Sequence, residues 1–376
     1  MNEHDIRFVE HALVLARKGI GLASPNPTVG CVIVRDGQIV GEGFHQYEAK
    51  DHAEIVALKS AGEKARGATL YATLEPCNHV GRTGPCTETI IAAGIQRVVA
   101  AIEDPNPKTS GSGFEKLRAA GIEVVSGVCE EEARRLNEAF ACWIRTGKPL
   151  VTLKSALTLD GQLALPGERM QFRSRSLARK KQTRITSEES LAEVHRMRHA
   201  ADALLTGIGT VHVDDPLLTD RSGLPRRRRL LRVILDSSLG LYENYSVVET
   251  AEDDLLVFTN QRATTLRARN LQRAGVEIIQ SQAVGGRIPL QSVLAELGRR
   301  DILSVLLEAG PTLNGAALAA GIVHKLVLFY APKISGESRV PFAIAPKAKL
   351  PPLHNLRAHQ FGPDIAIEGY FQDVYK

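Results

Sequence analysis

Four residues in the first third of the chain have the types and spacing of a catalytic metal site. His52 and Glu54 are separated by a single residue, and eight residues separate Cys77 from Cys86. A catalytic zinc is held by three protein ligands and keeps one position open. Glu54 is placed to move protons for water at such a metal. We therefore predict that His52, Cys77 and Cys86 bind Zn²⁺, with Glu54 as a catalytic residue.

The surrounding sequence strengthens this interpretation. His-x-Glu followed by Pro-Cys is the signature of nucleobase deaminases, in which water at the metal attacks a ring carbon that bears an amine. We expect His52 and Cys86 to lie at the starts of two helices, whose free N–H groups help to hold thiolates. The alternatives are a structural zinc site, with His79 as the nearby fourth ligand, or free cysteines beside a loop.

The elements that position these residues follow from hydrophobic periodicity. In the first half, the pattern predicts helices at 4–18, from 52, at 86–94, 112–120 and 130–145, and strands at 31–34, 38–41, 68–74, 97–102 and 122–126. Arg35-Asp36-Gly37 predicts a hairpin turn. In the second half it predicts strands at 150–156, 231–235, 255–258, 277–279, 305–308 and 325–330, and at 203–211 a strand that runs into a glycine turn. It predicts helices at 188–200, at 290–299 and after Ala316. This alternation predicts an α/β fold with a partly parallel sheet.

Length and composition place limits on the class of protein. A chain of 376 residues is too long for one ordinary core, which predicts two domains. The sequence has neither a membrane-length apolar run nor the apolar core of a signal peptide, so we expect a cytoplasmic protein. Five scattered cysteines argue against a disulfide framework. A net charge of +5 permits an anionic substrate but does not indicate nucleic acid.

Three stretches of the first half resemble one known family. They are Ser24-Pro25-Asn26-Pro27-x-Val29-Gly30-Cys31-Val32-Ile33, His52-Ala53-Glu54, and Glu75-Pro76-Cys77-x-His79-x-Gly81-Arg82-Thr83-x-Pro85-Cys86. Together they look like the bifunctional deaminase–reductase of riboflavin biosynthesis. The resemblance implies a diaminopyrimidinone substrate with a ribosylamino 5′-phosphate, and a pocket lined by Asn26, His45, His79, Arg82, Asp104 and Asn106.

The chemistry of these side chains fits that substrate. A guanidinium such as that of Arg82 makes fork-shaped contacts with phosphate. Asn26 offers both a donor and an acceptor to a pyrimidine edge. Both Asn26 and Asn106 lie in Pro-Asn-Pro turns, however, where asparagine is common for backbone reasons alone.

The second half contains a strand, a glycine turn and a helix at 305–316, an arrangement that suits an anion. Alone this signal is weak, because a structural Gly-Pro turn looks the same. Lys154 with Asp160-Gly161, the run from Gly207 to Thr219, Asp236-Ser237 and Glu308 to Thr312 are similar to the reductase half of the same family. That resemblance implies a dihydrofolate-reductase-like fold that uses NADPH.

The resemblance also implies roles for residues of the second half. Lys154 would be catalytic, polarising C1 of the ring-opened ribose or orienting its hydroxyls while hydride is delivered. The substrate would contact Gln182, Arg198, Leu218, Arg221 and Glu308. The cofactor would contact Leu157, Arg184, Thr210, Asp214, Ser237, Gly310, Pro311, Thr312, Leu313, Asn314, Gly315 and Ala316. For Arg198 the alternative is a solvated helix face.

One region departs from the family pattern. Arg184 stands where the family usually has Trp, which puts the nicotinamide contact in doubt. The segment before it has seven basic and no acidic residues between Arg169 and Arg184. The simpler interpretation of this basic segment is a solvated loop. The more specific hypothesis is that it attracts phosphate-bearing ligands to the reductase site.

We therefore expect a cytidine-deaminase-like three-layer domain at 1–147 and a dihydrofolate-reductase-like domain at 148–376. The expected partner is a phosphorylated pyrimidine, with neither nucleic acid nor membrane, and the chain is expected to form a homo-oligomer. Three alternatives stay open: a nucleic-acid base deaminase with a binding module, a deaminase with an impaired reductase half, and a metal-stabilised scaffold. Aromatic residues make up 5% of the chain, which leaves few stacking platforms for nucleic acid.

Overall fold

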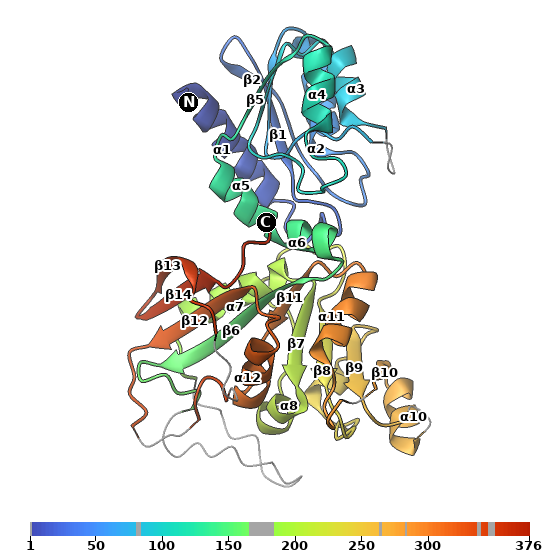
Figure 1. Cartoon of the computed structure of the whole chain (residues 1–376), viewed down its shortest axis with the longest axis vertical. Helices are drawn as coiled ribbons and strands as arrows, with labels where there is room; N and C mark the ends of the chain where they lie inside the picture. Colours follow the sequence, from blue (N-terminus) through green and yellow to red (C-terminus); the bar gives the residue numbers. More distant parts are fainter. Residues whose placement is uncertain are drawn as a thin grey trace. The chain divides into compact units, whose positions relative to one another are not determined.

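The structure is a computed structural model that describes residues 2–79, 84–164, 184–262, 265–282, 284–336, 340–344 and 350–376. The chain forms two compact units (Figure 1). The first contains Met1–Gly147 together with Pro225–Arg228 and Tyr375, and the second contains Lys148–Leu224, Arg229–Val374 and Lys376. No helix in the described ranges is long and apolar enough to cross a membrane.

The first unit is built on a five-stranded sheet of order β2-β1-β3-β4-β5. Its strands are β1 (Gly30–Arg35), β2 (Gln38–Phe44), β3 (Thr69–Ala72), β4 (Arg97–Ala100) and β5 (Glu123–Ser126), and its helices are α1 (Glu3–Arg17), α2 (Ala53–Ala61), α3 (Cys86–Ala92), α4 (Ser112–Ala119), α5 (Glu130–Leu136), α6 (Glu138–Thr146) and the short 3-10 helix η1 (Gly62–Ala65). β1 is antiparallel to both β2 and β3, whereas β3, β4 and β5 are parallel. The predicted hairpin is confirmed, and both Asp36 and Gly37 have the positive φ that its tight turn requires.

Two glycines bring helix α2 very close to the sheet. A Cβ at Gly41 would lie 2.3 Å from the Ala57 carbonyl oxygen, and one at Gly43 would lie 2.4 Å from that of Ala53. Only glycine leaves room for such an approach of backbone to backbone. The start of α2, which carries His52 as its N-cap, is therefore fixed against β2.

The second unit contains a nine-stranded sheet of order β10-β9-β8-β7-β11-β6-β12-β14-β13. Its strands are β6 (Leu150–Thr158), β7 (Ala203–Gly207), β8 (Leu231–Leu235), β9 (Leu255–Thr259), β10 (Val276–Gln280), β11 (Ser304–Leu307), β12 (Lys325–Ala331), β13 (His354–Phe361) and β14 (Asp364–Tyr370). Its helices are α7 (Glu188–Ala200), α8 (Ile208–Asp214), α9 (Ser246–Glu249), α10 (Leu266–Arg273), α11 (Leu290–Arg299) and α12 (Pro311–Ala319).

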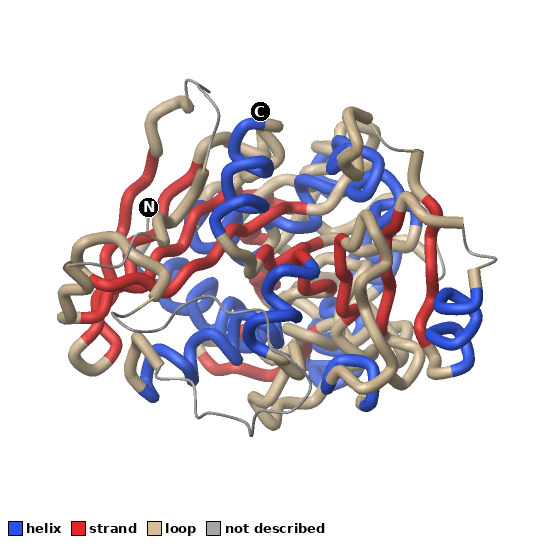
Figure 2. Tube along the Cα trace, turned by 90° about the horizontal axis from the view of Figure 1, so that it is seen from below, coloured by secondary structure: helices blue, strands red, loops and turns tan. Residues whose placement is uncertain are grey.

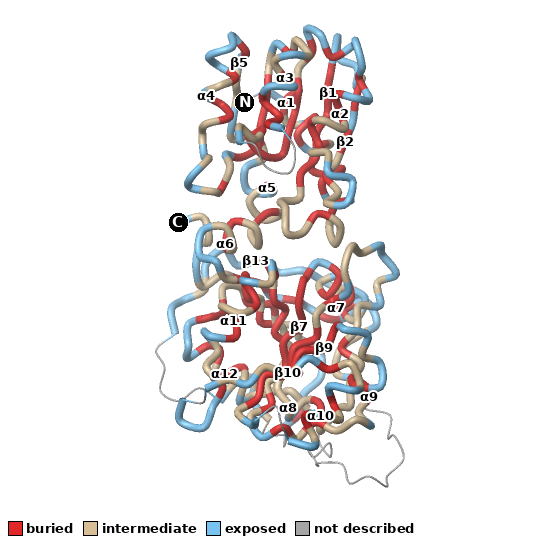
Figure 3. The backbone as a smooth tube through the Cα atoms, turned by 90° about the vertical axis from the view of Figure 1, so that its right-hand side faces the viewer, coloured by how far each residue is buried: buried red, intermediate tan, exposed pale blue. Residues whose placement is uncertain are grey.

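The strands from β10 to β12 are parallel, and the last two are antiparallel. Helices lie on both sides of the strands (Figure 2). A parallel sheet covered in this way is buried on both faces, and the buried residues follow its strands (Figure 3). Because parallel strands end at one edge, the residues that follow β7, β8 and β11 lie near one another.

Three sequence predictions about these elements are wrong. The segment 203–211 is predicted to be a strand that runs into a glycine turn; the strand does end at Gly207, but the helix Ile208–Asp214 follows in place of the turn. The helix expected at 130–145 breaks at Asn137, whose side chain accepts from the Thr28 N–H at 2.8 Å and donates to the Thr28 carbonyl at 3.1 Å. The last helix begins at Pro311 instead of after Ala316, because proline suits the first helical position. The hairpin of β13 and β14 was not predicted at all.

Candidate active site

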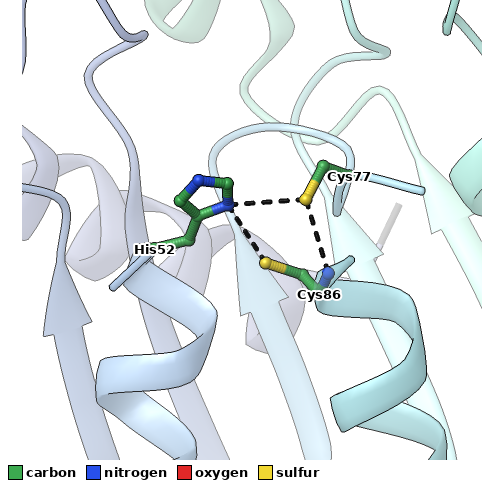
Figure 4. Close-up of side chains that lie close together, drawn as sticks. All are labelled: His52, Cys77 and Cys86. Atoms are coloured by element: carbon green, nitrogen blue, oxygen red, sulfur yellow. Dashed lines mark hydrogen bonds between the residues drawn. The ribbon is translucent and has the colours of Figure 1, made fainter. Parts of the chain in front are cut away.

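The three predicted metal ligands lie together in the first unit. Their ligand atoms are all within 4.8 Å of one another, and the side chains point toward a common centre (Figure 4). The Nδ1 atom of His52 is 3.2 Å from the Sγ of Cys86 and 3.4 Å from the Sγ of Cys77. His52 is the N-cap of α2 and Cys86 is the first residue of α3, so both predicted helix starts are confirmed.

This donor set fits a zinc ion. With bonds of about 2.0 Å to nitrogen and 2.3 Å to sulfur, tetrahedral zinc needs ligand atoms roughly 3.5 to 3.8 Å apart. The observed separations of 3.2 and 3.4 Å are close to that spacing. Two thiolates and one imidazole are a soft set that suits zinc better than magnesium or calcium.

The protonation of the cluster also suits a cation. A hydrogen bond with Cys86 lowers the pKa of Cys77 to about 4, although burial opposes this, and His52 lowers it further. The same hydrogen bond, together with burial, raises the pKa of Cys86. The hydrogen bond with Cys77 raises the pKa of His52. Cys77 is thus disposed to bind a cation as a thiolate, whereas Cys86 releases its proton when a divalent cation binds.

Glu54 is the second residue of helix α2, which begins directly after His52, and Glu54 is only 4% exposed. Burial raises the pKa of its carboxyl to about 7, because the charged form is poorly solvated there. His52 lowers this pKa and Cys77 raises it. A carboxyl balanced near neutrality can both accept and return a proton, as general acid–base chemistry requires.

These residues open onto a cavity of about 300 Å³. Its lining includes seven predicted site residues: Asn26, His45, His52, Glu54, Cys77, His79 and Asp104. It also includes six residues to which the sequence analysis assigned no role in the site, which are Pro27, Val29, Tyr47, Lys50, Leu74 and Glu75. The position of Tyr47 and Lys50 between His45 and His52 was the available signal for those two.

Asn26 and His45 form a hydrogen-bonded pair in this cavity. The Nδ1 of His45 lies 2.8 Å from the Asp51 carbonyl, which can only accept, so this nitrogen carries the proton. The Nε2 of His45 then accepts from the side-chain amide of Asn26 at 3.0 Å. The orientation of the Asn26 amide is therefore fixed, and among the described residues no donor is bound to its oxygen.

Glu75 organises the other side of the cavity. Its carboxylate accepts from the backbone N–H groups of Asp104 at 3.0 Å, Gly111 at 2.9 Å, Gly113 at 2.7 Å and Phe114 at 3.3 Å. These contacts fix the loop that presents Asp104. Asn106 does not line the cavity, and its side-chain oxygen accepts from the Lys108 N–H at 3.1 Å in a local turn. Arg82 lies outside the described residues.

In the second unit, Lys154, Arg198 and Glu308 form a cluster of charges. Glu308 accepts from Arg198 through two bonds of 2.8 and 3.0 Å and from the Lys154 ammonium at 3.1 Å. Burial raises the pKa of Glu308, but the two cations outweigh it and hold this pKa at about 2. Arg198 is 9% exposed, so the alternative of a solvated helix face is wrong for it.

The loop that carries the predicted substrate residues Leu218 and Arg221, called here the substrate loop, lies beside this cluster. Arg198 donates from Nη1 to the Thr219 carbonyl at 3.1 Å, and the Nδ1 of His199 lies 3.1 Å from a carboxylate oxygen of Asp220. Leu218 is 3% exposed, whereas Arg221 is exposed. Gln182 and the basic residues from Arg169 onward lie outside the described residues; only Arg184, at the end of that run, is described.

The residues predicted to bind the cofactor follow the ends of parallel strands. Thr210 and Asp214 lie in α8, Ser237 follows β8, and the run from Gly310 to Ala316 forms the N-cap and first turns of α12. A Cβ at Gly207 would contact Leu313 at 3.5 Å, so α12 passes close to the end of β7. A helix start at this edge of a parallel sheet is the usual place for a dinucleotide phosphate.

The predicted cofactor residues Leu157, Asn314 and Arg184 differ in their surroundings. Leu157 is 1% exposed and belongs to strand β6. Asn314 is fully buried and donates to the Phe342 carbonyl at 2.8 Å. Arg184 is exposed and pairs with Glu188 one helical turn away.

Comparison with known proteins gives consistent matches over both units. The model of the RibD C-terminal domain matches residues 149–367, and that of the cytidine and deoxycytidylate deaminase zinc-binding region matches residues 2–102. The riboflavin biosynthesis protein RibD of Aquifex aeolicus is 44% identical over 90% of this chain and 89% of its own length. The protein of the same name from Escherichia coli is 37% identical over 96% of this chain and 98% of its own.

Solved structures give the same result. RibD of Acinetobacter baumannii matches with a TM-score of 0.82 and 35% identity, covering 98% of this chain and 99% of that chain. A diaminohydroxyphosphoribosylaminopyrimidine deaminase/5-amino-6-(5-phosphoribosylamino)uracil reductase from Thermotoga maritima matches with a TM-score of 0.82 and 36% identity over the same shares.

Proposed function

The chain belongs to the RibD family of riboflavin-biosynthesis proteins. We propose which of its residues carry out each of the two reactions of this family. It is a bifunctional enzyme, a pyrimidine deaminase and a reductase. We assign the deaminase to residues 1–147 and the reductase to residues 148–376.

The deaminase acts on 2,5-diamino-6-(5-phosphoribosylamino)pyrimidin-4-one. Water adds to the ring carbon that bears the amine, and ammonia leaves, so that a carbonyl replaces the amine. When bound by His52, Cys77 and Cys86, zinc supplies the Lewis acidity that activates water. Glu54 takes a proton from the water and passes it to the leaving nitrogen.

The cavity beside Glu54 selects and orients the pyrimidine. The free oxygen of the Asn26 amide, whose nitrogen is committed to His45, accepts from the ring edge. His79 and Asp104 line the same cavity and supply further polar contacts. Arg82 binds the phosphate of the ribosyl chain through its forked donors.

The reductase uses NADPH, which supplies hydride to C1 of the ring-opened ribose and so gives a ribityl chain. The residues from Gly310 to Ala316 bind the cofactor phosphates at the start of α12. Lys154 is held at 3.1 Å by Glu308 and polarises the carbon that accepts the hydride. Arg198 and Leu218 position the ribosylamino group.

The observation that carries the deaminase assignment is the cluster of three ligand atoms within 4.8 Å of one another beside a buried carboxyl. The test is an assay of the purified, zinc-loaded protein with the pyrimidine substrate and NADPH. We expect ammonia release followed by NADPH oxidation, and ammonia release alone from a Lys154→Ala variant. Absence of ammonia release from the zinc-loaded wild-type protein would sink the deaminase assignment.

The impaired-reductase alternative has one observation in its favour, because Arg184 pairs with Glu188 where the family usually has Trp. The complete cluster of Lys154, Arg198 and Glu308 favours an active reductase. The assay above separates the two, since ammonia release without NADPH oxidation would support the impaired enzyme. Cytoplasmic location and homo-oligomer formation belong to the proposal as well.

A further inference from the structure

The loop between α8 and Arg221 has an unusual backbone. Asp215 and Leu218 both have positive φ, at 43° and 56°. For leucine this left-handed conformation is disfavoured, because its Cβ approaches the following carbonyl. Such a residue keeps this conformation only when its surroundings impose it.

A fully buried arginine on β8 contacts this loop. Arg232 is 0% exposed and donates from Nη1 to the Leu217 carbonyl at 3.1 Å, to the Val247 carbonyl at 3.2 Å and to the Thr250 hydroxyl at 2.9 Å. Its Nη2 donates to the Thr250 carbonyl at 2.8 Å and to Asp254 at 2.5 Å. The planar fork of a guanidinium can meet several acceptors in fixed directions at once, which an ammonium cannot do.

A second arginine holds the loop from the other side of Leu218. Arg198 donates to the Thr219 carbonyl and also binds Glu308 through two bonds. The peptide plane that precedes Leu218 is therefore fixed by Arg232, and the plane that follows Thr219 is fixed by Arg198. Asp215 adds a third attachment, because it accepts from the N–H and hydroxyl of Ser246 at 2.7 and 2.9 Å.

We propose that Arg232 is a positioning residue for the reductase reaction, which holds Leu218 in its left-handed conformation and thereby shapes the site for the ribosylamino substrate. The inference rests on the proposed function, since that function places Leu218 and Arg198 against this substrate. Arg232 acts through the Leu217 carbonyl, whereas Arg198 belongs to the charged cluster itself. Sequence reasoning missed Arg232, because an arginine in a strand gives no signal of the loop that it will contact.

The test is steady-state reduction of 5-amino-6-(5-phosphoribosylamino)uracil by the full chain at saturating NADPH. In the Arg232→Lys variant one ammonium replaces the fork and cannot satisfy both the Leu217 carbonyl and the acceptors at Thr250 and Asp254. We expect KM for this substrate to rise about tenfold, as for the loss of one hydrogen bond from a charged group. The kcat should change less than about twofold, as for a lost binding contact.

Two comparisons make the result specific. Ammonia release from the pyrimidine substrate depends on the first unit, so it should be unchanged in Arg232→Lys and provides an internal reference. Thr250→Val removes another acceptor of the same guanidinium but leaves the Leu217 bond, so its KM should equal that of the wild-type protein. A wild-type KM in Arg232→Lys, or an equal rise in both variants, would overturn the proposal.

If Arg232→Lys does not fold, Asp254→Asn provides the second variant. It keeps the guanidinium but weakens the bond that orients it, so we expect a KM rise of about threefold with unchanged ammonia release. An unchanged KM there would also overturn the proposal. Failure of the proposed function has a different signature, because the wild-type chain itself would then show no NADPH-dependent reduction.

Discussion

The two units each place a shielded glutamate at the centre of their chemistry, but with opposite charge environments. Glu54 is 4% exposed and has a pKa raised to about 7, mainly by burial. The side chain of Glu308 is 13% exposed, and its pKa falls to about 2, because Lys154 and Arg198 outweigh the effect of burial. Within the part of the chain that the structure describes, no lysine or arginine is among the groups that shift the pKa of Glu54.

The difference shows that burial alone does not decide what a carboxyl can do. A carboxyl without a strong cationic partner can exchange protons near neutral pH, and Glu54 therefore suits acid–base chemistry. A carboxyl bound by two cations stays ionised, and Glu308 therefore orients Lys154 and Arg198 instead of moving protons. Replacing each glutamate by glutamine should separate these roles.

The largest expected effect is on deamination in Glu54→Gln. Glutamine keeps the shape but cannot carry the proton, so ammonia release should fall by about 10²- to 10⁴-fold. The folded protein should lose less than about 1 kcal/mol, because a buried carboxyl near neutrality contributes little stability. Reduction of supplied 5-amino-6-(5-phosphoribosylamino)uracil should stay at the wild-type rate. A large loss of stability in this variant would contradict the comparison.

Glu308→Gln should act mainly on stability and on reduction. It leaves Lys154 and Arg198 without their counter-charge, and breaking such a buried pair costs about 3 kcal/mol or more. Amide hydrogen exchange of peptides from β6 and β11 measures this loss within the second unit. Fluorescence of Trp143, the single tryptophan of the chain, is the control, because it reports on the first unit. Equal destabilisation by Glu54→Gln and Glu308→Gln would show that the two sites do not differ as described.

The pH dependence of stability tests the same contrast without changing the active sites. The folded-state pKa of Glu308, about 2, lies below the ordinary value of 4.5. Its contribution is therefore fully present above about pH 4.5 and is lost as the pH falls through 2, amounting to about 3 kcal/mol. Exchange protection of β11 should fall over that window in the wild-type chain. The same protection should be nearly flat in Glu308→Gln.

The smallest expected effect is on substrate recognition in the first unit. Asn26→Ala removes one neutral hydrogen-bonding group, worth about 1 kcal/mol, so KM for deamination should rise about fivefold. The value of kcat should change less, because Asn26 does not exchange protons. Asn106→Ala is the matched control, since Asn106 lies in a similar turn but outside the cavity lining. An equal rise in both variants would show that the effect is on the loops instead of on the cavity.

The catalytic centre of the first unit was largely predictable from the sequence. The metal ligands and the catalytic glutamate are recognised by residue type and by short spacing at helix starts: His52, Glu54, Cys77 and Cys86. Such local features depend little on the rest of the fold. The predicted fold class, a cytidine-deaminase-like domain followed by a reductase domain, is confirmed by the comparisons. Strands that are bounded by glycine turns could also be predicted, because those signals lie within a few residues of each strand.

What could not be predicted depends on contacts between distant residues. The break at Asn137 arises from its bonds to Thr28, and no local pattern reports that pairing. Glu75 looked like part of the Pro-Cys motif, yet its carboxylate organises a loop some thirty residues away. The buried position of Arg232 likewise became visible only once β8 and the substrate loop were placed together.

The close packing of α2 on β2 has a consequence for attempts to change the specificity of the deaminase. Gly41 and Gly43 present only hydrogen atoms to the carbonyls of Ala57 and Ala53. Any library of variants that introduces larger side chains at these two positions would move the start of α2 and with it the metal ligand His52. Random mutagenesis should therefore find its tolerated solutions at Tyr47 and Lys50, which line the cavity and lie outside α2. The contact between α2 and β2 therefore has to stay unchanged, whereas the cavity wall at Tyr47 and Lys50 can be varied.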